Sequence, residues 1–523
     1  MTYSKLVNLP ELICEIIKCF RNDFSTLYSC ILVNRLWCRL AIPLLWEDPF
    51  SIYAQNFQFI EIYLGNLNED EDAKQHLVDQ NLITKNCSST LFNYPSFIKR
   101  LNTREIVYSI GNWLQDDMIY WPIIVYRSLF KMFIENEGNL HSFEFEYHTF
   151  HNFNFLNVTM ELTLQNPNFT CNIRNLKFSM SITNIRGNMF PLLKFLCSNC
   201  NSISSFYIGY KYKDGNNTLI EKCLTQMFNT QQSIEKISFE CYDSLYDSFS
   251  LLTNISNTLK IITFYRVDFE EIIINIQEIF NQLNVLETIH IIYCYSLNSD
   301  FVQQIINVIR PFKLKSLILK YYLQVESLQL LIQKFGSDLE NFEFSKGLLH
   351  GESKQKRQKL LESIIEYCTK IKYFSLRDIN INLALNLIEN IKKQSLNYLN
   401  IKFDYDYDDY ESKNLGQILP SKLEFLKLDL IKPNYLKIFL ENFQDTFIKR
   451  LFIKIEFQEE YKDILSYIKE YIMKKKRVKY LAILIDNQDL IFLEDEVEEF
   501  ELYNIKVQRY YESYIRAIDI VNN

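Results

Sequence analysis

The chain has 523 residues, of which 48% are hydrophobic and 23% are charged. This length exceeds one ordinary core, so several domains or a repeat array are expected, and the apolar content excludes a disordered chain. A formal charge of −8 argues against nucleic acid or an anionic membrane surface as a partner. With only 10 glycines and 10 prolines, a fold rich in tight turns is also disfavoured.

Residues 9–50 form an apolar block in which three short helices are expected. The first starts at Leu9, with Pro10 at a position where its missing N–H is harmless. The second begins after Asp23, a good helix N-cap, and the third covers about residues 35–46. Three helices of this size bury little surface, so the block is expected to leave an apolar patch for a partner.

The motifs of this block resemble the F-box. Leu9-Pro10 is followed by "LVNRLW" (32–37) and then by Leu45-Trp46, although the stretch after Pro10 is shorter than that family's usual pattern. The resemblance implies docking onto a Skp-family adaptor and, through it, a cullin of a ubiquitin ligase. It also implies an adaptor-binding surface made of Leu9, Pro10, Ile13, Ile16, Val33 and Trp37. The alternative is that Ile16, Val33 and Trp37 form the core of the block, and one large ring can serve both purposes.

The block is expected to be the first of four parts of the chain. These are an F-box-like helical domain (1–50), a linker with degenerate first repeats (51–139), a repeat solenoid (140–500) and a C-terminal cap or tail (501–523). Within the linker, "YPSFIKRLN" (94–102) fits a degenerate first strand. Near the end of the chain, "EDEVEEFELYNIKV" (494–507) suits a polar cap on an end strand.

A short template recurs thirteen times from residue 140 onward, at intervals of 25 to 33 residues. It consists of an aliphatic residue, two variable residues, an apolar residue, a variable residue and an apolar residue, as in "IRNLKF" (173–178) and "LEFLKL" (423–428). Between copies, segments such as 302–312 and 435–447 place apolar residues three and four apart, which indicates amphipathic helices. A strand followed by a helix at this period is typical of a leucine-rich repeat solenoid, whose repeats stack to bury their apolar faces.

Over about residues 140–490 the chain resembles leucine-rich repeat proteins. The implied fold class is α/β, with the three-helix block followed by an irregular solenoid whose parallel sheet lies on the concave face and whose helices lie outside. That family usually has Asn or Cys eight positions after the first Leu, bonded to backbone where the chain leaves the strand, and Cys294 keeps this feature. Irregular turns are expected because other repeats carry different residues there, among them His148, Lys211, Tyr322 and Asp404.

Alternation along each strand places the third, fifth and seventh template residues on the open face of the sheet. Thirteen strands about 4.8 Å apart make a surface roughly 60 Å long, enough for a protein partner. On the last strands this face is aromatic and basic, which suits an acidic or phosphorylated segment with apolar anchors. The candidate substrate-binding residues are Tyr373, Arg377, Tyr398, Lys402, Phe425, Lys427, Arg450, Lys454 and Tyr480. The alternative is an aromatic run produced by the abundance of Phe and Tyr alone.

No catalytic motif or cofactor signature is recognised, so the chain is expected to be no enzyme and to need no cofactor. The lone "CSNC" (197–200) is interpreted as buried thiols, and "HTFH" (148–151) lacks a metal-ligand set, so no metal is expected. With no recognised signal peptide or membrane span, a cytosolic or nuclear protein with reduced cysteines is expected. The alternative to a ligase subunit is a non-catalytic leucine-rich repeat scaffold acting outside a ubiquitin ligase.

Overall fold

The computed structural model divides the chain into two compact units, Met1–Leu259 and Lys260–Asn523. The described residues are 10–21, 23–51, 57–65, 67, 72–79, 83, 90–114, 120–147, 153–180, 186–200, 202–210, 218–231, 233–241, 249–270, 272–319, 323–345, 353–379, 381–391, 396–403, 415–420, 422–429, 431, 433–442, 447–455, 461–473 and 477–510. None of the described helices is long and apolar enough to cross a bilayer.

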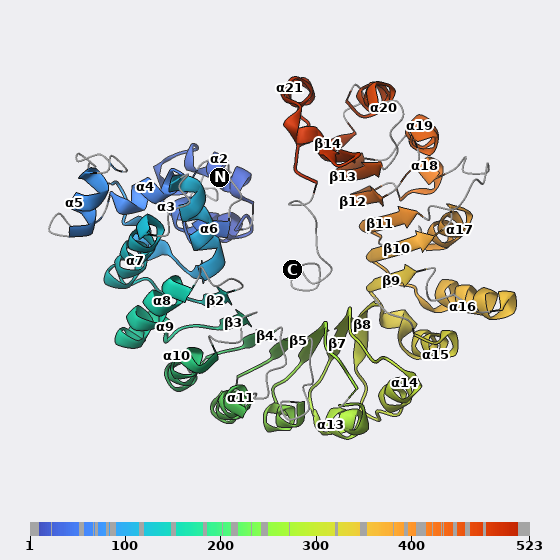
Figure 1. The fold of residues 1–523 in the computed structure, drawn as a ribbon, viewed down its shortest axis with the longest axis horizontal. Coiled ribbons are helices and arrows are strands. Elements are labelled where there is room, and N and C mark those ends of the chain that lie inside the picture. Colours follow the sequence, from blue (N-terminus) through green and yellow to red (C-terminus); the bar gives the residue numbers. More distant parts are fainter. Residues whose placement is uncertain are drawn as a thin grey trace, which may run out of the picture. The chain divides into compact units, whose positions relative to one another are not determined.

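The first unit begins with the three expected helices and continues as alternating strands and helices (Figure 1). Its helices are α1 (Pro10–Lys18), α2 (Phe24–Ile31), α3 (Arg35–Leu45), α4 (Phe59–Leu64), α5 (Asp72–Asp79), α6 (Thr103–Leu114), α7 (Tyr120–Glu135), α8 (Phe153–Gln165), α9 (Pro167–Thr170), α10 (Arg186–Asn199) and α11 (Thr218–Thr230). Its strands are β1 (Arg100–Asn102), β2 (Ser142–Tyr147), β3 (Asn175–Met180), β4 (Ser205–Tyr210) and β5 (Lys236–Cys241). Short 3-10 turns lie at η1 (Pro49–Ser51), η2 (Tyr94–Phe97) and η5 (Leu251–Ile255).

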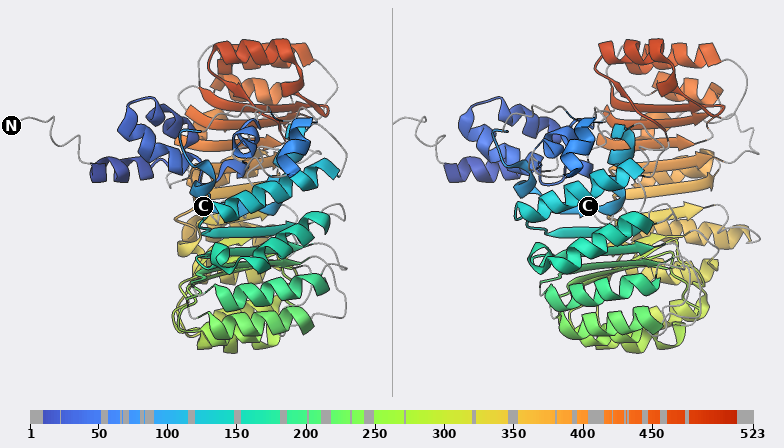
Figure 2. Two further views of the ribbon diagram at one scale, coloured as in Figure 1. Left: turned by 90° about the vertical axis from the view of Figure 1, so that its left-hand side faces the viewer. Right: turned by 60° about the vertical axis from the view of Figure 1, so that its left-hand side comes forward.

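Strands β1 to β5 pair in parallel in chain order, as a repeat solenoid requires. The degenerate strand expected in the linker is confirmed, because Arg100–Asn102 pairs with Ser142–Glu144 of β2. In Figure 2 the teal and green helices of this unit are stacked side by side along one face of its strands. Among the described residues, no helix of the repeats lies on the opposite face of the sheet, which is called the open face below.

The second unit repeats the same arrangement, and its strands β10 and β12 to β14 are longer than those of the first unit. Its strands are β6 (Ile261–Tyr265), β7 (Thr288–Ile292), β8 (Lys313–Ile318), β9 (Asn341–Ser345), β10 (Tyr373–Ile379), β11 (Tyr398–Phe403), β12 (Lys422–Asp429), β13 (Phe447–Ile455), β14 (Val478–Ile485), β15 (Gln488–Asp489) and β16 (Lys506–Val507). Its helices are α13 (Ile276–Gln282), α14 (Ser299–Ile306), α15 (Val325–Phe335), α16 (Lys354–Tyr367), α17 (Ile381–Ile391), α18 (Leu415–Ile418), α19 (Pro433–Asn442), α20 (Tyr461–Ile468) and α21 (Glu494–Leu502).

The end of the second unit shows how its last full strand is covered. Strand β14 pairs with β13 in parallel, with β15 in antiparallel fashion, and with β16 through Tyr480 and Leu481. The expected cap segment 494–507 is thus present as α21 and β16, which meet the edge of β14. An edge strand covered in this way offers fewer unpaired backbone groups to other chains.

The alternation of side chains along each strand explains which template residues form the core. Phe143 and Phe145, the fourth and sixth template residues of β2, are both fully buried. Cys294 keeps the backbone bond expected from its position, since its Sγ donates to the carbonyl oxygen of Phe264 on the preceding strand at 3.4 Å. The register between β7 and β8 shifts after Ile289, so the sheet is irregular at this position. The chain is therefore an α/β protein with the architecture of an irregular leucine-rich repeat solenoid.

Candidate interaction surfaces

The three-helix block has a small closed core. Its fully enclosed members are Ile13, Ile17, Leu27, Cys30 and Ala41. The Asp23 carboxylate accepts the main-chain N–H of Thr26 at 3.1 Å, which confirms this residue as the N-cap of α2. The Asn34 side chain caps α3 in the same way by accepting the N–H of Trp37 at 3.0 Å.

The expected adaptor-binding residues divide between core and surface. Pro10 is exposed at the first position of α1, and Ile16 and Val33 are 42% and 57% exposed. Trp37 is half-buried against the core, so it packs there and still presents part of its ring. Ile13 is only 3% exposed and does not lie on the free surface, which corrects its assignment to the interface. The remaining member, Leu9, lies outside the described residues.

The correction at Ile13 follows from the register of α1. Leu12, one residue earlier, is 47% exposed and lies one helical turn from Ile16, so both side chains lie on the same face of the helix. Tyr28 and Leu32, also one turn apart, are exposed on and just after α2 beside Val33 in sequence. The block surface is defined here as Leu12, Ile16, Tyr28, Leu32 and Val33. Five exposed large apolar side chains within so short a segment make it a candidate interaction site.

Trp46 and Glu47 tie the block to the rest of the first unit. The Trp46 ring meets Tyr63 edge-on at 5.1 Å and Tyr94 at 4.2 Å between ring centroids. The buried Glu47 carboxylate faces Arg21 at 3.1 Å, and its main-chain carbonyl accepts the N–H of Arg100 at 3.1 Å. The block is thus held against the first strand of the solenoid by a buried aromatic and a buried charge.

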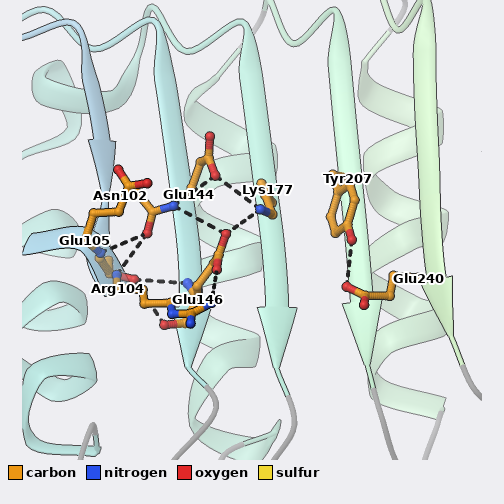
Figure 3. Close-up of polar contacts among 9 residues, drawn as sticks. Asn102, Arg104, Glu105, Glu144, Glu146, Lys177, Tyr207 and Glu240 are labelled. Atoms are coloured by element: carbon orange, nitrogen blue, oxygen red, sulfur yellow. Dashed lines mark hydrogen bonds and ion pairs between the residues drawn. The ribbon is translucent and has the colours of Figure 1, made fainter. Parts of the chain in front are cut away.

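A polar cluster occupies the open face of β1, β2 and β3 (Figure 3). The Asn102 side chain donates to Glu144 at 3.1 Å, and the Lys177 ammonium lies 3.3 Å from Glu144 and also pairs with Glu146. Arg104 approaches Glu146 at 3.8 Å. Along the same face, the Tyr207 hydroxyl donates to Glu240 at 2.6 Å. The three carboxylates Glu144, Glu146 and Glu240 outnumber the two basic groups Arg104 and Lys177, and the Glu105 carboxyl lies beside them, so the face is acidic.

The sequence prediction did not find this cluster. The third template positions of β2 and β3 are the uncharged Ser142 and Asn175. The signal lies instead at the fifth and seventh positions, where "FEFEY" (143–147) alternates a buried aromatic with a carboxylate.

Replacing Glu105 by glutamine is expected to stabilise the first unit at alkaline pH. Burial raises the pKa of the Glu105 carboxyl from 4.5 to about 8, with Asp48, Glu144 and Glu146 adding to the effect. A carboxyl with a higher pKa in the folded state stabilises it below the unfolded value, and this contribution disappears as pH rises through the folded pKa. The free energy of unfolding of the wild type should therefore fall between about pH 4.5 and about pH 8, more steeply than that of Glu105→Gln.

Urea unfolding at about pH 5, pH 7 and pH 9 measures this difference. Glu161→Gln is the matched control, because a hydrogen bond from Arg127 lowers the pKa of Glu161 and its loss should destabilise the protein at neutral pH. Identical pH profiles for wild type and Glu105→Gln contradict the prediction.

The candidate substrate-binding residues lie in aligned columns on the open face of β10 to β14. Tyr373 pairs in register with Tyr398, Tyr398 with Phe425, Phe425 with Arg450, and Arg450 with Tyr480. The Arg450 guanidinium lies over the Tyr480 ring, 5.5 Å from its centroid. The third template positions of the last five repeats therefore form one continuous row across the sheet.

Burial divides these candidates into two groups. Tyr373, Phe425 and Lys427 are buried in the described structure. The half-buried members are Arg377, Tyr398, Lys402, Arg450, Lys454 and Tyr480. Only the second group presents side-chain surface to a partner without a rearrangement of the chain.

Carboxylates of the chain itself pair with several of the basic candidates. Lys402 lies 2.9 Å from Asp378, and Lys427 lies 3.0 Å from Asp429. Arg377 lies 2.8 Å from the buried Glu343. The positive charge expected on this face is thus largely balanced within it.

Neither cysteine of the lone CxxC is available to a ligand. Cys197 and Cys200 are both buried, and burial raises the pKa of the Cys200 thiol to about 12. The Cys200 thiol donates to the carbonyl oxygen of Thr170 at 3.1 Å. Among the described residues, no group of three His, Cys, Asp or Glu side chains is placed to hold a metal ion. The two histidines of "HTFH", at positions 148 and 151, lie outside the described residues.

The described residues thus form an α/β protein with the architecture of a leucine-rich repeat solenoid and an N-terminal three-helix block. No protein-family model matches the chain, and no curated protein matches it either.

Solved structures similar to this chain include the following two. One is that of the Rad7 and Elc1 complex in yeast, with a TM-score of 0.39 and 13% identity over 68% of this chain and 88% of that chain. The other is the leucine-rich repeat-containing protein LegL7 from Legionella pneumophila, with a TM-score of 0.28 and 10% identity over 62% of this chain and 90% of that chain. Neither similarity supports a transfer of function.

Proposed function

We propose that this protein is the substrate-recognition subunit of a cullin-based ubiquitin ligase. In this function the three-helix block docks a Skp-family adaptor, and the open face of the solenoid binds a target protein in the cytosol or nucleus. The chain itself catalyses no reaction and uses no cofactor. The observation that carries the proposal is the block surface, because five large apolar side chains within 22 residues are exposed on helices fixed to a repeat array.

The energetics of the block surface suit a stable docking site. Fully burying an exposed aliphatic side chain contributes about 1.5–3 kcal/mol. Leu12, Ile16 and Val33 are each about half exposed, so burying the rest of their surface contributes about 2–5 kcal/mol in total. The block core is already closed around Ile17 and Leu27, so docking needs no refolding of the helices.

Replacing Ile16 by glutamate is expected to weaken adaptor binding by about 100-fold or more, because it removes apolar burial and introduces a charge into the interface. The measurement is co-purification of the full chain with a recombinant Skp-family adaptor, followed by calorimetric titration. Ile309→Glu is the matched control, since Ile309 is 84% exposed on the second unit and should leave binding unchanged.

Two outcomes would decide against this function. If the wild-type chain does not bind the adaptor, the protein is better described as a leucine-rich repeat scaffold that acts outside a ubiquitin ligase. If Ile16→Glu and Ile309→Glu bind equally well, the block surface is not the docking site. Circular dichroism of both variants verifies that the helices remain folded.

A further inference from the structure

Tyr510 closes over the open face of β12, β13 and β14. Its side chain is only 3% exposed and packs with Phe425, Phe452, Ala482 and Leu484. The Tyr510 and Phe452 ring centroids are 6.0 Å apart. Ala482 is the register partner of Phe452, and its small side chain leaves room for a ring beside the two phenylalanines.

Polar groups on the same face interact with the hydroxyl, the main-chain N–H and the ring of Tyr510. The Tyr510 hydroxyl donates to the Asp429 carboxylate, and its main-chain N–H donates to Asp489 at 2.7 Å. The Lys427 ammonium lies 5.2 Å from the centre of the Tyr510 ring, a cation–π geometry. The face therefore recognises the ring, the hydroxyl and the backbone of one tyrosine. This tyrosine site is defined by Phe425, Lys427, Asp429, Phe452, Ala482, Leu484 and Asp489.

The segment that delivers Tyr510 is held by few backbone bonds. Strand β16 pairs with β14 only at Tyr480–Lys506 and Leu481–Val507, and the Gln508 N–H adds one bond to the Leu481 carbonyl at 2.8 Å. By comparison, β13 pairs with β14 over seven register positions. A short strand at a sheet edge opens at a lower free energy than the central strands. An extended segment of another protein can replace it by the same strand addition.

We propose that the tyrosine site is the target-docking site of this protein and that Tyr510 occupies it in the free chain. The partner segment is extended and presents an unmodified tyrosine. A phosphotyrosine does not fit, because its phosphate would replace the hydroxyl donor with a dianion against Asp429. The inference rests on the proposed function, since it names the class of segment that the solenoid selects. It also explains why Phe425 and Lys427 are buried in the absence of a partner.

The test measures binding of a fluorescent peptide, acetyl-Val-Gln-Arg-Tyr-amide, which repeats residues 507–510. Tyr510→Ala removes the internal competitor, so this full-length variant should bind the peptide about tenfold or more tighter than the wild type. Peptides ending in alanine or phosphotyrosine should bind Tyr510→Ala about tenfold or more weakly than the tyrosine peptide. Tyr503→Ala, a change in the same segment outside the site, should behave as the wild type.

Tyr510→Phe keeps the ring and loses only the hydrogen bond to Asp429. This variant replaces Tyr510→Ala in the test if Tyr510→Ala does not fold. Its affinity for the tyrosine peptide should exceed that of the wild type by about threefold or more. The proposal is overturned if folded Tyr510→Ala binds the tyrosine and alanine peptides equally or binds neither. It is equally overturned if Tyr510→Phe binds no tighter than the wild type. Adaptor binding is unaffected by any of these results, so the failure of this inference is distinguishable from failure of the proposed function.

Discussion

Replacing Phe145 by alanine is expected to lower the free energy of unfolding of the first unit by about 3–5 kcal/mol. The Phe145 side chain is fully buried, and its ring lies parallel to Phe178 of the next strand at 4.9 Å between centroids. It also meets Phe143 at 4.1 Å. Removal of the ring leaves a cavity whose walls belong to two neighbouring repeats, and tightly packed interiors relax only in part.

The loss should be local, because each repeat of a solenoid contacts only its neighbours. Hydrogen exchange should therefore accelerate in β2 and β3 more than in β11 and β12, and urea unfolding should begin at a lower concentration. Phe492→Ala is the matched control, since Phe492 is 66% exposed and its loss should change stability by less than about 0.5 kcal/mol. Equal losses in the two variants would show that Phe145 does not belong to a close-packed core.

The repeat architecture was predictable because its signal is local. In "IRNLKF" (173–178) the apolar alternation directly places Leu176 and Phe178 in the core, and both are buried. Boundaries were less accurate. The helix expected at 435–447 is α19 (Pro433–Asn442), and Phe447 already belongs to β13. An apolar residue at helical spacing can equally start the next strand, so periodicity alone does not separate the two.

The residues of the candidate sites were predictable only where their exposure depends on a single helix or strand. Ile16 and Val33 are exposed as expected, but one residue of register in α1 places Leu12 outside and Ile13 inside. On the open face, alternation assigns Phe425 to the correct side of the sheet. It cannot show that Tyr510, 81 residues beyond Asp429, returns to cover that side. Contacts of such long range are absent from a periodic pattern.

Replacing Arg377 by methionine is expected to destabilise the second unit by about 1–2 kcal/mol at about pH 8. The Arg377 guanidinium lies 2.8 Å from the Glu343 carboxylate, whose side chain is only 2% exposed. Ser375 and Asn400 beside them are also buried, so no water-filled surface can take over the charge. Removal of the cation leaves a buried carboxylate without its counter-charge, and this costs more than an intact pair contributes.

The pH dependence of the loss identifies its cause. Burial raises the pKa of Glu343 from 4.5 to about 7, with Arg377 opposing the shift. Because the folded pKa is the higher one, Glu343 stabilises the fold below about pH 4.5, and this contribution is lost as pH rises through about pH 7. The cost of Arg377→Met should therefore be smaller at about pH 5, where Glu343 is neutral, than at about pH 8.

Chemical unfolding of three variants separates this charge effect from lost packing. Lys402→Met is the matched control, because its pair with Asp378 is half exposed and should contribute less than about 1 kcal/mol. The double variant Arg377→Met/Glu343→Gln should recover most of the stability at about pH 8, since neither charge then remains. If the double variant is as unstable as Arg377→Met, or if the loss is equal at both pH values, Arg377 stabilises the sheet through its aliphatic stem rather than its charge.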